Sequence, residues 1–132
     1  MRIRITSVPV DNQEKTLQFY MRKLGLVAKS DIPLGEFRWL TVVSPDEEND
    51  VELLLEPLGF APANTYQQEL FKAAIPYTSF AVENIETEAK RLEKAGVVFR
   101  SKPAQHVPVM IAVIEDTCGD LIQLMRHGLF LA

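Results

Sequence analysis

The chain has 132 residues, 47% of them hydrophobic and 24% charged, a composition typical of one compact domain with one hydrophobic core. Lys and Arg total 14 against 18 Asp and Glu, so the formal charge of -4 argues against a nucleic-acid partner. No apolar run approaches the roughly 18 residues that span a bilayer, and the start, MRIRITSVPV, lacks the apolar stretch of a signal peptide. We therefore expect a cytoplasmic protein without a membrane partner. The single cysteine, Cys118, excludes an internal disulfide and a zinc site built from several cysteines.

The first part of the chain predicts the element order βαβββ. Ile3 to Val10 alternates in hydrophobicity and is rich in β-branched residues, which indicates a strand. Asp11 or Asn12 is a good N-cap for a helix that Gly25 ends. Turn residues then separate three further expected strands, at Leu26 to Ser30, Phe37 to Ser44 and Val51 to Glu56.

The second part of the chain predicts the same order after a linker. The linker, residues 61–75, begins near Pro62 and includes a short expected helix from Thr65 to Ala73. The expected elements that follow are a strand from Tyr77 to Val82, a helix from Asn84 to Ala95, and strands at Val97 to Ser101, Pro108 to Ile114 and Leu121 to Met125.

An internal repeat supports two copies of one unit. The segment Lys23 to Ser30 aligns with Lys94 to Ser101 at an offset of 94 − 23 = 71 residues. At this offset Val51-Glu52-Leu53 falls on Ile122-Gln123-Leu124, and Phe37 to Val43 falls on Pro108 to Ile114. Upstream, Val10-Asp11-Asn12 falls on Val82-Glu83-Asn84 at an offset of 72. We expect a single α+β domain, 1–132, with βαβββ modules at 1–60 and 76–132 and the linker between them.

Side-chain alternation divides each expected sheet into a face toward its helix and an open face, which we call the cup face. In the fourth strand Leu53 and Leu55 are expected to face the helix, which leaves Glu52 on the cup face. A mostly apolar surface with a few polar groups is typical of a small-molecule pocket. The residues expected on the two cup faces are Ile5, Ser7, Phe37, Trp39, Thr41, Glu52, Leu54, Tyr77, Ser79, Ala81, Met110, Ala112, Gln123 and Met125.

Several segments in this order resemble the vicinal oxygen chelate superfamily, which includes glyoxalase I, bleomycin-resistance proteins and extradiol dioxygenases. The resemblance covers nearly the whole chain, and its carriers are Val10-Asp11-Asn12 through Leu17, Phe19 and Tyr20 to Leu24-Gly25-Leu26, then Val51 to Pro57, Phe80 to Ile85 and Asp116 to Leu124. It implies two βαβββ modules whose mixed sheets pair into a concave cup, often across a homodimer. One fold can host many functions, so the resemblance is more informative about fold than about activity.

The resemblance also implies a set of metal-ligand positions. Enzymes of the family typically hold a divalent metal with one residue from each module's first strand, usually His, and one from each fourth strand, usually Glu. The matching positions here are Ile5, Glu52, Tyr77 and Gln123. Only Glu52 keeps the usual ligand type, because Ile5 has no donor atom, Gln123 is neutral and the Tyr77 phenol has a reference pKa of about 10. Transition metals prefer imidazole and carboxylate donors, so we expect no bound metal and no cofactor.

The remaining polar residues leave alternatives open. The expected ligand-binding residues are Ser7, Trp39, Thr41, Glu52, Tyr77, Ser79, Met110 and Gln123. Glu52 is the best candidate for a catalytic group, and the alternative is a carboxylate that hydrogen-bonds Tyr77 or Gln123. Trp39 and Met110 are either pocket wall or core filler. His106 and His127 are expected to be surface residues, with pocket contact as a further alternative for His106.

Three hypotheses of function follow. The leading one is a metal-free family member that binds a small organic molecule in the cup, as the bleomycin-resistance branch does. The second is a metal-dependent lyase or dioxygenase of the glyoxalase type. The third is a non-catalytic homodimer that serves as an interaction module.

Overall fold

The computed structural model describes residues 1–46, 51–106 and 109–126, with the backbone alone described at 105, 106 and 109. It confirms the α+β class and two tandem modules with one topology. Module 1 comprises β1 (Ile5–Val10), α1 (Gln13–Arg22), β2 (Val27–Leu34), β3 (Phe37–Val43) and β4 (Glu52–Pro57). Module 2 comprises β5 (Thr78–Val82), α3 (Ile85–Lys94), β6 (Phe99–His106), β7 (Val109–Glu115) and β8 (Leu121–Arg126).

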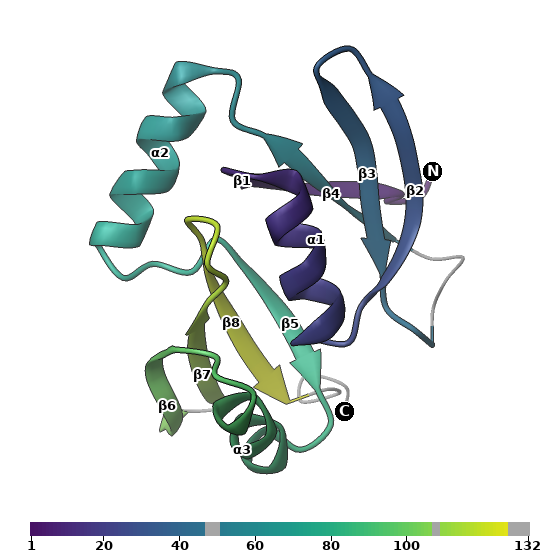
Figure 1. Ribbon diagram of the computed structural model, residues 1–132. Helices are drawn as coiled ribbons and strands as arrows, with labels where there is room; N and C mark the ends of the chain where they lie inside the picture. Colours follow the sequence, from purple (N-terminus) through teal and green to yellow (C-terminus); the bar gives the residue numbers. More distant parts are fainter. Residues whose placement is uncertain (47–50, 107–108, 127–132) are drawn as a thin grey trace.

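Each module forms its own four-stranded sheet, as Figure 1 shows. The strand order is β1-β4-β3-β2 in sheet A and β5-β8-β7-β6 in sheet B. In both sheets the first strand runs parallel to the fourth, and the other neighbours are antiparallel. The first strand therefore occupies one edge of each sheet, beside the strand that carries Glu52 or Gln123.

The helix between the modules, α2 (Ala61–Lys72), begins four residues before the expected start at Thr65. Pro62 lies in its first turn, where its missing N–H costs no helical hydrogen bond. β2 and β6 are each longer than expected, since each pairs with the next strand through its full hairpin. Proline at positions 33 and 103 did not end these strands, because both are outer strands of their sheets.

The helix starts of the two modules match. The side chain of Asn12 accepts a hydrogen bond from the Lys15 backbone N–H at 2.9 Å, and the side chain of Asn84 accepts one from that of Thr87 at 3.0 Å. Each asparagine thus satisfies one of the free N–H groups of its helix. This confirms Asn12, rather than Asp11, as the first N-cap.

The strand register corrects the sequence offset in the second half of each module. Val8 pairs with Leu55 and Phe80 pairs with Leu124, so Leu124 is the counterpart of Leu55 at an offset of 124 − 55 = 69. β3 and β7 correspond at an offset of 109 − 37 = 72. The expected offset of 71 is therefore wrong for both strands. The offsets of 72 and 69 differ because residues 44–51 separate β3 from β4, whereas only 116–120 separate β7 from β8.

This correction moves two residues to the other sheet face. Ala112 pairs with Leu124 and is fully buried in the core, and Met110 packs against the same core. The expectation that Met110 and Ala112 lie on the cup face of sheet B is therefore wrong. An error of one residue reverses the face of every side chain in a strand. Ile111 and Val113 occupy the cup face instead, as the partners of Met125 and Gln123.

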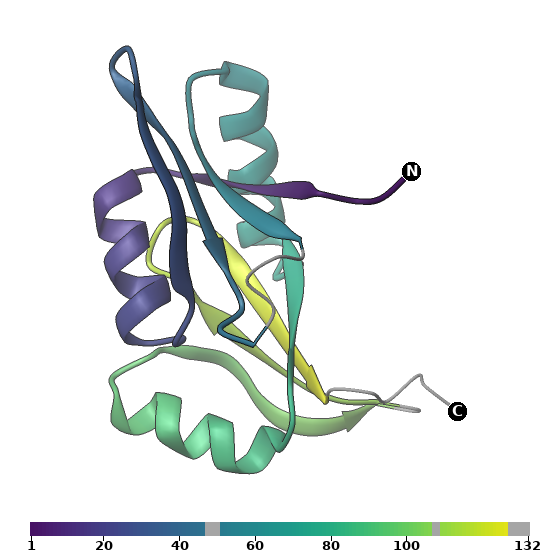
Figure 2. The same ribbon diagram turned by 90° about the vertical axis from the view of Figure 1, so that its right-hand side faces the viewer.

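One hydrophobic core joins the two modules. It includes Leu40 and Leu55 of module 1 together with Leu92 and Ile122 of module 2. α1 lies between its own sheet and module 2 (Figure 1). The ring of Tyr20 in α1 meets that of Phe80 edge to face, with 6.2 Å between the ring centroids. The N-terminal end of β1 points away from both α1 and α3 (Figure 2). In the described part of the chain, no helix is long and apolar enough to cross a membrane.

Candidate functional site

On sheet A, the cup face holds Glu52 in a fixed position. The Thr41 hydroxyl donates to Glu52 Oε1 at 2.7 Å and accepts a hydrogen bond from the Ser30 backbone N–H at 3.1 Å. The hydrogen bond from Ser30 to Thr41 forms at a bulge between Ala28 and Ser30, which interrupts the pairing of β2 with β3. Thr41 is fully buried, so it orients the partly exposed Glu52 carboxylate rather than offering its own hydroxyl to a ligand.

The same face continues along the β2–β3 hairpin as an apolar surface. Ile32 pairs with Trp39 and Leu34 pairs with Phe37, so the four side chains project from one side of the hairpin. Ile32, Leu34 and Phe37 are exposed, and Trp39 is partly buried. This confirms the expectation from alternation that Trp39 lies on the cup face of sheet A.

On sheet B, the cup face carries a smaller polar group. Gln123 Nε2 donates to Ser79 Oγ at 3.1 Å, and the two residues are direct neighbours on β8 and β5. Just before β5, the Tyr77 ring packs edge to face against Tyr66 of α2 at 6.0 Å. Burial raises the pKa of the Tyr77 phenol, with smaller contributions from the charges of Asp120, Tyr66 and Glu56. Tyr77 is therefore a neutral hydrogen-bonding group at physiological pH.

The structure does not bring the two polar groups into one cavity of the chain. The described hydrogen bond of the Glu52 side chain is with Thr41. The alternative predicted from the sequence, a hydrogen bond with Tyr77 or Gln123, is not found among the described residues. A cavity of about 840 Å³ does lie between the modules. Core-face residues such as Val42, Leu53 and Phe80 line it, and of the expected ligand-binding residues it includes only Ser79.

The four positions implied by the family resemblance differ in their geometry. Ile5 lies directly beside Glu52 in sheet A, whereas Gln123 lies beside Ser79, two residues beyond Tyr77. By register, the counterpart of Gln123 is Leu54 (123 − 69 = 54), not Glu52. The donors at the four positions are one carboxylate, one amide oxygen and one phenol with a raised pKa, and Ile5 supplies none. This set does not fit a transition-metal ion.

A second polar cluster lies in the turn between β7 and β8. Asp116 Oδ1 accepts hydrogen bonds from the backbone N–H groups of Cys118 and Asp120, each at 3.0 Å, and its Oδ2 accepts one from the Tyr20 hydroxyl at 2.6 Å. Asp120 Oδ1 accepts a hydrogen bond from Gln67 Nε2 at 3.1 Å. The cluster thus connects module 1, α2 and module 2.

Asp116, Cys118 and Asp120 place possible ligand atoms within 4.8 Å of one another, but their surroundings favour a structural role. Both Asp116 oxygens are already hydrogen-bonded. Burial raises the pKa of the Cys118 thiol well above its ordinary value, so the thiolate needed by a nucleophile or a metal ligand is disfavoured. Burial, followed by the charge of Asp116, raises the pKa of Asp120 to about 8.

Two residues with important contacts were not singled out by the sequence. Gln67 Nε2 also donates to the backbone carbonyl of Pro9 at 2.9 Å, and Gln13 bonds the backbones of β3 and β4. Glutamine on a predicted helix ordinarily indicates a solvent-exposed position, so no local pattern identifies either residue. His127 lies outside the described residues, and at position 106 the structure describes the backbone of β6 alone.

The topology and the open sheet faces define a class of proteins in which two βαβββ modules present concave sheets. The family model described as "Glyoxalase/Bleomycin resistance protein/Dioxygenase superfamily" matches residues 2–124. The chain belongs to this superfamily.

Three similar proteins show the range of the family. The uncharacterized protein YurT of Bacillus subtilis (strain 168) is 45% identical over 126 residues, which cover 96% of this chain and 99% of YurT. A lactoylglutathione lyase of Neisseria meningitidis serogroup B (strain ATCC BAA-335 / MC58) is 30% identical, with 96% and 91% covered. The crystal structure of TnmS3, an antibiotic binding protein from Streptomyces sp. CB03234, superimposes with a TM-score of 0.76 at 24% identity, with 96% and 95% covered.

Proposed function

We propose that this protein binds a small organic molecule, without a metal, in a cup formed by the sheet A face of one copy and the sheet B face of a second copy. The observation that carries the proposal is the exposed apolar surface of Ile32, Leu34, Phe37 and Trp39 beside the fixed carboxylate of Glu52. An apolar wall with few oriented polar groups is the usual composition of a ligand pocket.

The contacts within one chain support a cup between two copies. The described contacts between the modules run through Tyr20 and through Lys23, whose Nζ donates to the Ala95 carbonyl at 2.5 Å. These contacts use the helix side of module 1 and leave Ile32, Leu34 and Phe37 on its cup face exposed. The likeness to an antibiotic binding protein supports a fold that accommodates organic ligands.

The ligand can be tested with the purified protein. Mass spectrometry of small molecules that co-purify with the native protein should detect a bound organic compound. Because Trp39 is the only tryptophan, its emission should change when that compound is added back to the stripped protein. Glu52→Gln should weaken cationic ligands more than neutral ones. If the compound leaves Trp39 emission unchanged and binds Trp39→Phe equally well, the cup assignment is wrong.

The absence of metal dependence can be tested separately. Zn²⁺, Ni²⁺, Mn²⁺ or Fe²⁺ should raise the melting temperature little if the protein does not bind them. A metal that did bind would stabilise the fold by about 2.7 kcal/mol at a hundredfold excess over Kd, which is easily measured. The 30% identity to a lactoylglutathione lyase favours a second candidate function, a metal-dependent lyase. A large metal-induced shift that Glu52→Gln abolishes would establish that second function.

The assembly is part of the same proposal. Sedimentation at micromolar concentration should show a homodimer, and a species of about 15 kDa, the mass of one chain, would remove the cup between copies. A dimer with no co-purifying molecule and no ligand-dependent shift in melting temperature would instead indicate a non-catalytic interaction module. We propose a cytoplasmic location, which fractionation of cells with an antibody to the protein tests.

A further inference from the structure

One difference between the two sheets is the ladder between the third and fourth strands. In sheet B this ladder includes the pairs Ala112 with Leu124 and Ile111 with Met125. By register their counterparts in sheet A are Leu40 with Leu55 and Trp39 with Glu56, and neither pair forms. Among the described residues, the ladder of sheet A contains two pairs, Thr41 with Leu54 and Val42 with Leu53. At its other end it also lacks Val43 with Glu52, the counterpart of Glu115 with Leu121.

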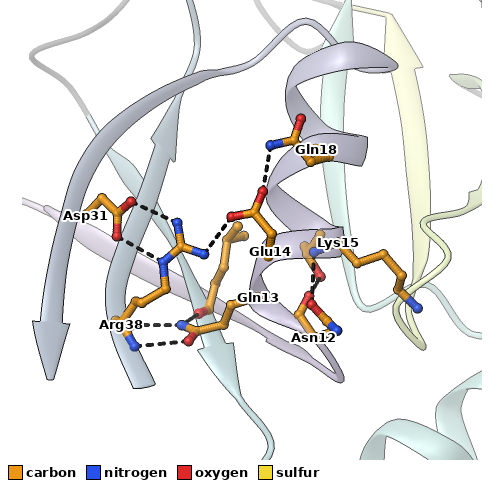
Figure 3. A network of polar contacts seen from close by, with 9 residues as sticks. Asn12, Gln13, Glu14, Lys15, Gln18, Asp31 and Arg38 are labelled. Atoms are coloured by element: carbon orange, nitrogen blue, oxygen red, sulfur yellow. Dashed lines mark hydrogen bonds and ion pairs between the residues drawn. The ribbon is translucent and has the colours of Figure 1, made fainter. Parts of the chain in front are cut away.

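A side chain occupies the position where the ladder of sheet A stops. The Arg38 backbone N–H donates to Gln13 Oε1 at 3.0 Å, and Gln13 Nε2 donates to the backbone carbonyls of Arg38 at 2.7 Å and Leu55 at 2.9 Å. Figure 3 shows the Gln13 amide beside the Arg38 backbone, at the start of α1. Exchanging both bonds with one residue is what a paired strand residue does in an antiparallel ladder. The Gln13 amide therefore replaces a piece of backbone between β3 and β4.

The counterpart of Gln13 in module 2 is Ile85, at the offset of 72 that relates the two N-cap asparagines. Ile85 is buried in the core and has no group that can bond a backbone. Where the helix carries isoleucine, the strands pair, and where it carries glutamine, they separate. Gln13 is itself 9% exposed, so its amide has lost most contact with water and depends on these three bonds.

We infer that Gln13 is a positioning residue, which holds β3 apart from β4 and thereby sets the place of Trp39 on the cup face. Without the Gln13 amide, extending the ladder by the pair Leu40 with Leu55 offers the freed Leu55 carbonyl a backbone N–H. Arg38 then lies opposite Pro57, whose carbonyl can accept from the Arg38 N–H but which has no N–H to donate, so the Arg38 carbonyl is left to water. Trp39 then lies directly opposite Glu56, as Ile111 lies opposite Met125 in sheet B. The inference rests on the proposed function in one respect, namely that Trp39 contacts the ligand.

The test compares Gln13→Ile, the module 2 residue, with Gln18→Ile on the same helix. Gln18 Nε2 donates to Glu14 on the helix surface and makes no described bond to β3 or β4, so it is a matched control. All measurements use the ligand-free protein. A negative result would therefore contradict the role of Gln13 without bearing on whether the protein binds a ligand. Gln13→Ile should show NMR cross-strand contacts between Trp39 and Glu56, and at least a twofold change in acrylamide quenching of Trp39. Wild type and Gln18→Ile should show neither.

A second variant keeps the inference testable if Gln13→Ile does not fold. In Gln13→Glu, the ionised carboxylate accepts from Arg38 N–H but cannot donate to the two carbonyls, whereas its protonated form regains one donor. Acrylamide quenching of Trp39 in this variant should approach the wild-type value as the pH falls from about 8 to about 5, with Gln18→Glu unchanged. Quenching equal to wild type at every pH in Gln13→Glu, or a Gln13→Ile protein without the new contacts, would overturn the inference.

Discussion

Module 1 and module 2 share topology, helix caps and strand order, yet their cup faces are built differently. In module 2, β7 and β8 pair from Ile111 with Met125 to Glu115 with Leu121. In module 1, the Gln13 amide stands between β3 and β4, and the face beyond it carries Trp39. A single helix residue can therefore alter a sheet without altering the fold, because its side chain can take over backbone hydrogen bonds.

The modules also differ in the turn before their last strand. Module 2 places Asp116 and Asp120 there, and Tyr20 and Gln67 bond them from α1 and α2. By register, the counterpart of Asp120 in module 1 is Val51 (120 − 69 = 51), which has no such group. One module thus carries the exposed apolar surface, and the other carries the polar junction that Tyr20 and Gln67 contact. The following changes test this division, from the largest expected effect to the smallest.

The shared core predicts that equivalent truncations in the two modules have equivalent effects. Leu55 and Leu124 are register counterparts and are both buried in the one core. Leu55→Ala and Leu124→Ala should each lower the free energy of unfolding by roughly 2–5 kcal/mol. Urea denaturation followed by far-UV circular dichroism should show one transition for both variants. Two transitions in either variant would show that the modules unfold independently.

The junction predicts a dependence of stability on pH that arises in module 2. In the fold, Asp120 keeps its proton to about pH 8, whereas the unfolded chain releases it near its reference pKa of about 3.9. Between these values the folded state binds more protons, so this group's stabilisation is complete below about pH 4 and is lost as the pH rises toward about 8. Wild type should therefore be less stable than Asp120→Asn at pH 9, by about 1–3 kcal/mol.

Denaturant titrations at several pH values between 5 and 9 measure this effect. Asp46→Asn, a change at an exposed carboxylate, controls for the loss of one negative charge. Burial, followed by the charge of Asp116, disfavours the ionised form of Asp120, and its buried oxygen Oδ2 has no hydrogen-bond partner among the described residues that would offset this. Parallel stability curves for wild type and Asp120→Asn would contradict a protonated Asp120.

The helix caps predict equal effects in the two modules. Asn12→Ala and Asn84→Ala each remove one side-chain acceptor from a helix N-terminus. Each change should cost about 1 kcal/mol, measured by thermal denaturation. Asn64→Ala, inside α2, is a control that removes no cap. A cost at only one of the two caps would show that tertiary contacts, rather than the cap, stabilise that helix start.

The smallest expected effect concerns the surface ion pairs of module 1. Arg38 bonds Asp31 through Nε and Nη2 and Glu14 through Nη1 (Figure 3), and the hydrogen bond with Asp31 is the largest contribution that raises the pKa of Arg38. Arg38→Met installs the residue found at its module 2 counterpart, Met110. The variant should lose about 0.5 kcal/mol at low salt and less in 0.5 M NaCl. A salt-independent loss would point to packing of the arginine stem instead.

Much of the fold could be predicted from local patterns. Alternation identified the strands, the pair Asp11 and Asn12 located the first helix start to within one residue, and the repeat identified two modules. The predicted cup face of sheet A was correct at Trp39 and Thr41. These features depend on neighbours in sequence, which is why the sequence alone was sufficient.

The register of the later strands depended on the tertiary structure. A constant offset of 71 placed Met110 and Ala112 on the wrong face, because β6 contains two register shifts against β7 where β2 contains one against β3. This additional residue leaves no trace in the hydrophobic pattern. The family positions were affected in the same way, since Leu54, rather than Glu52, corresponds to Gln123.

By itself, the sequence determined the βαβββ repeat, the approximate helix starts and the family, since each is set by residue types at short spacing. Only the tertiary structure decided that Thr41 donates a hydrogen bond to Glu52, that Gln13 separates β3 from β4, and that one oxygen of the buried Asp120 has no partner among the described residues. The physical reason is that a polar side chain in the interior is directed by whichever backbone or side-chain group is left unsatisfied there. Those groups belong to strands and turns far away in the sequence.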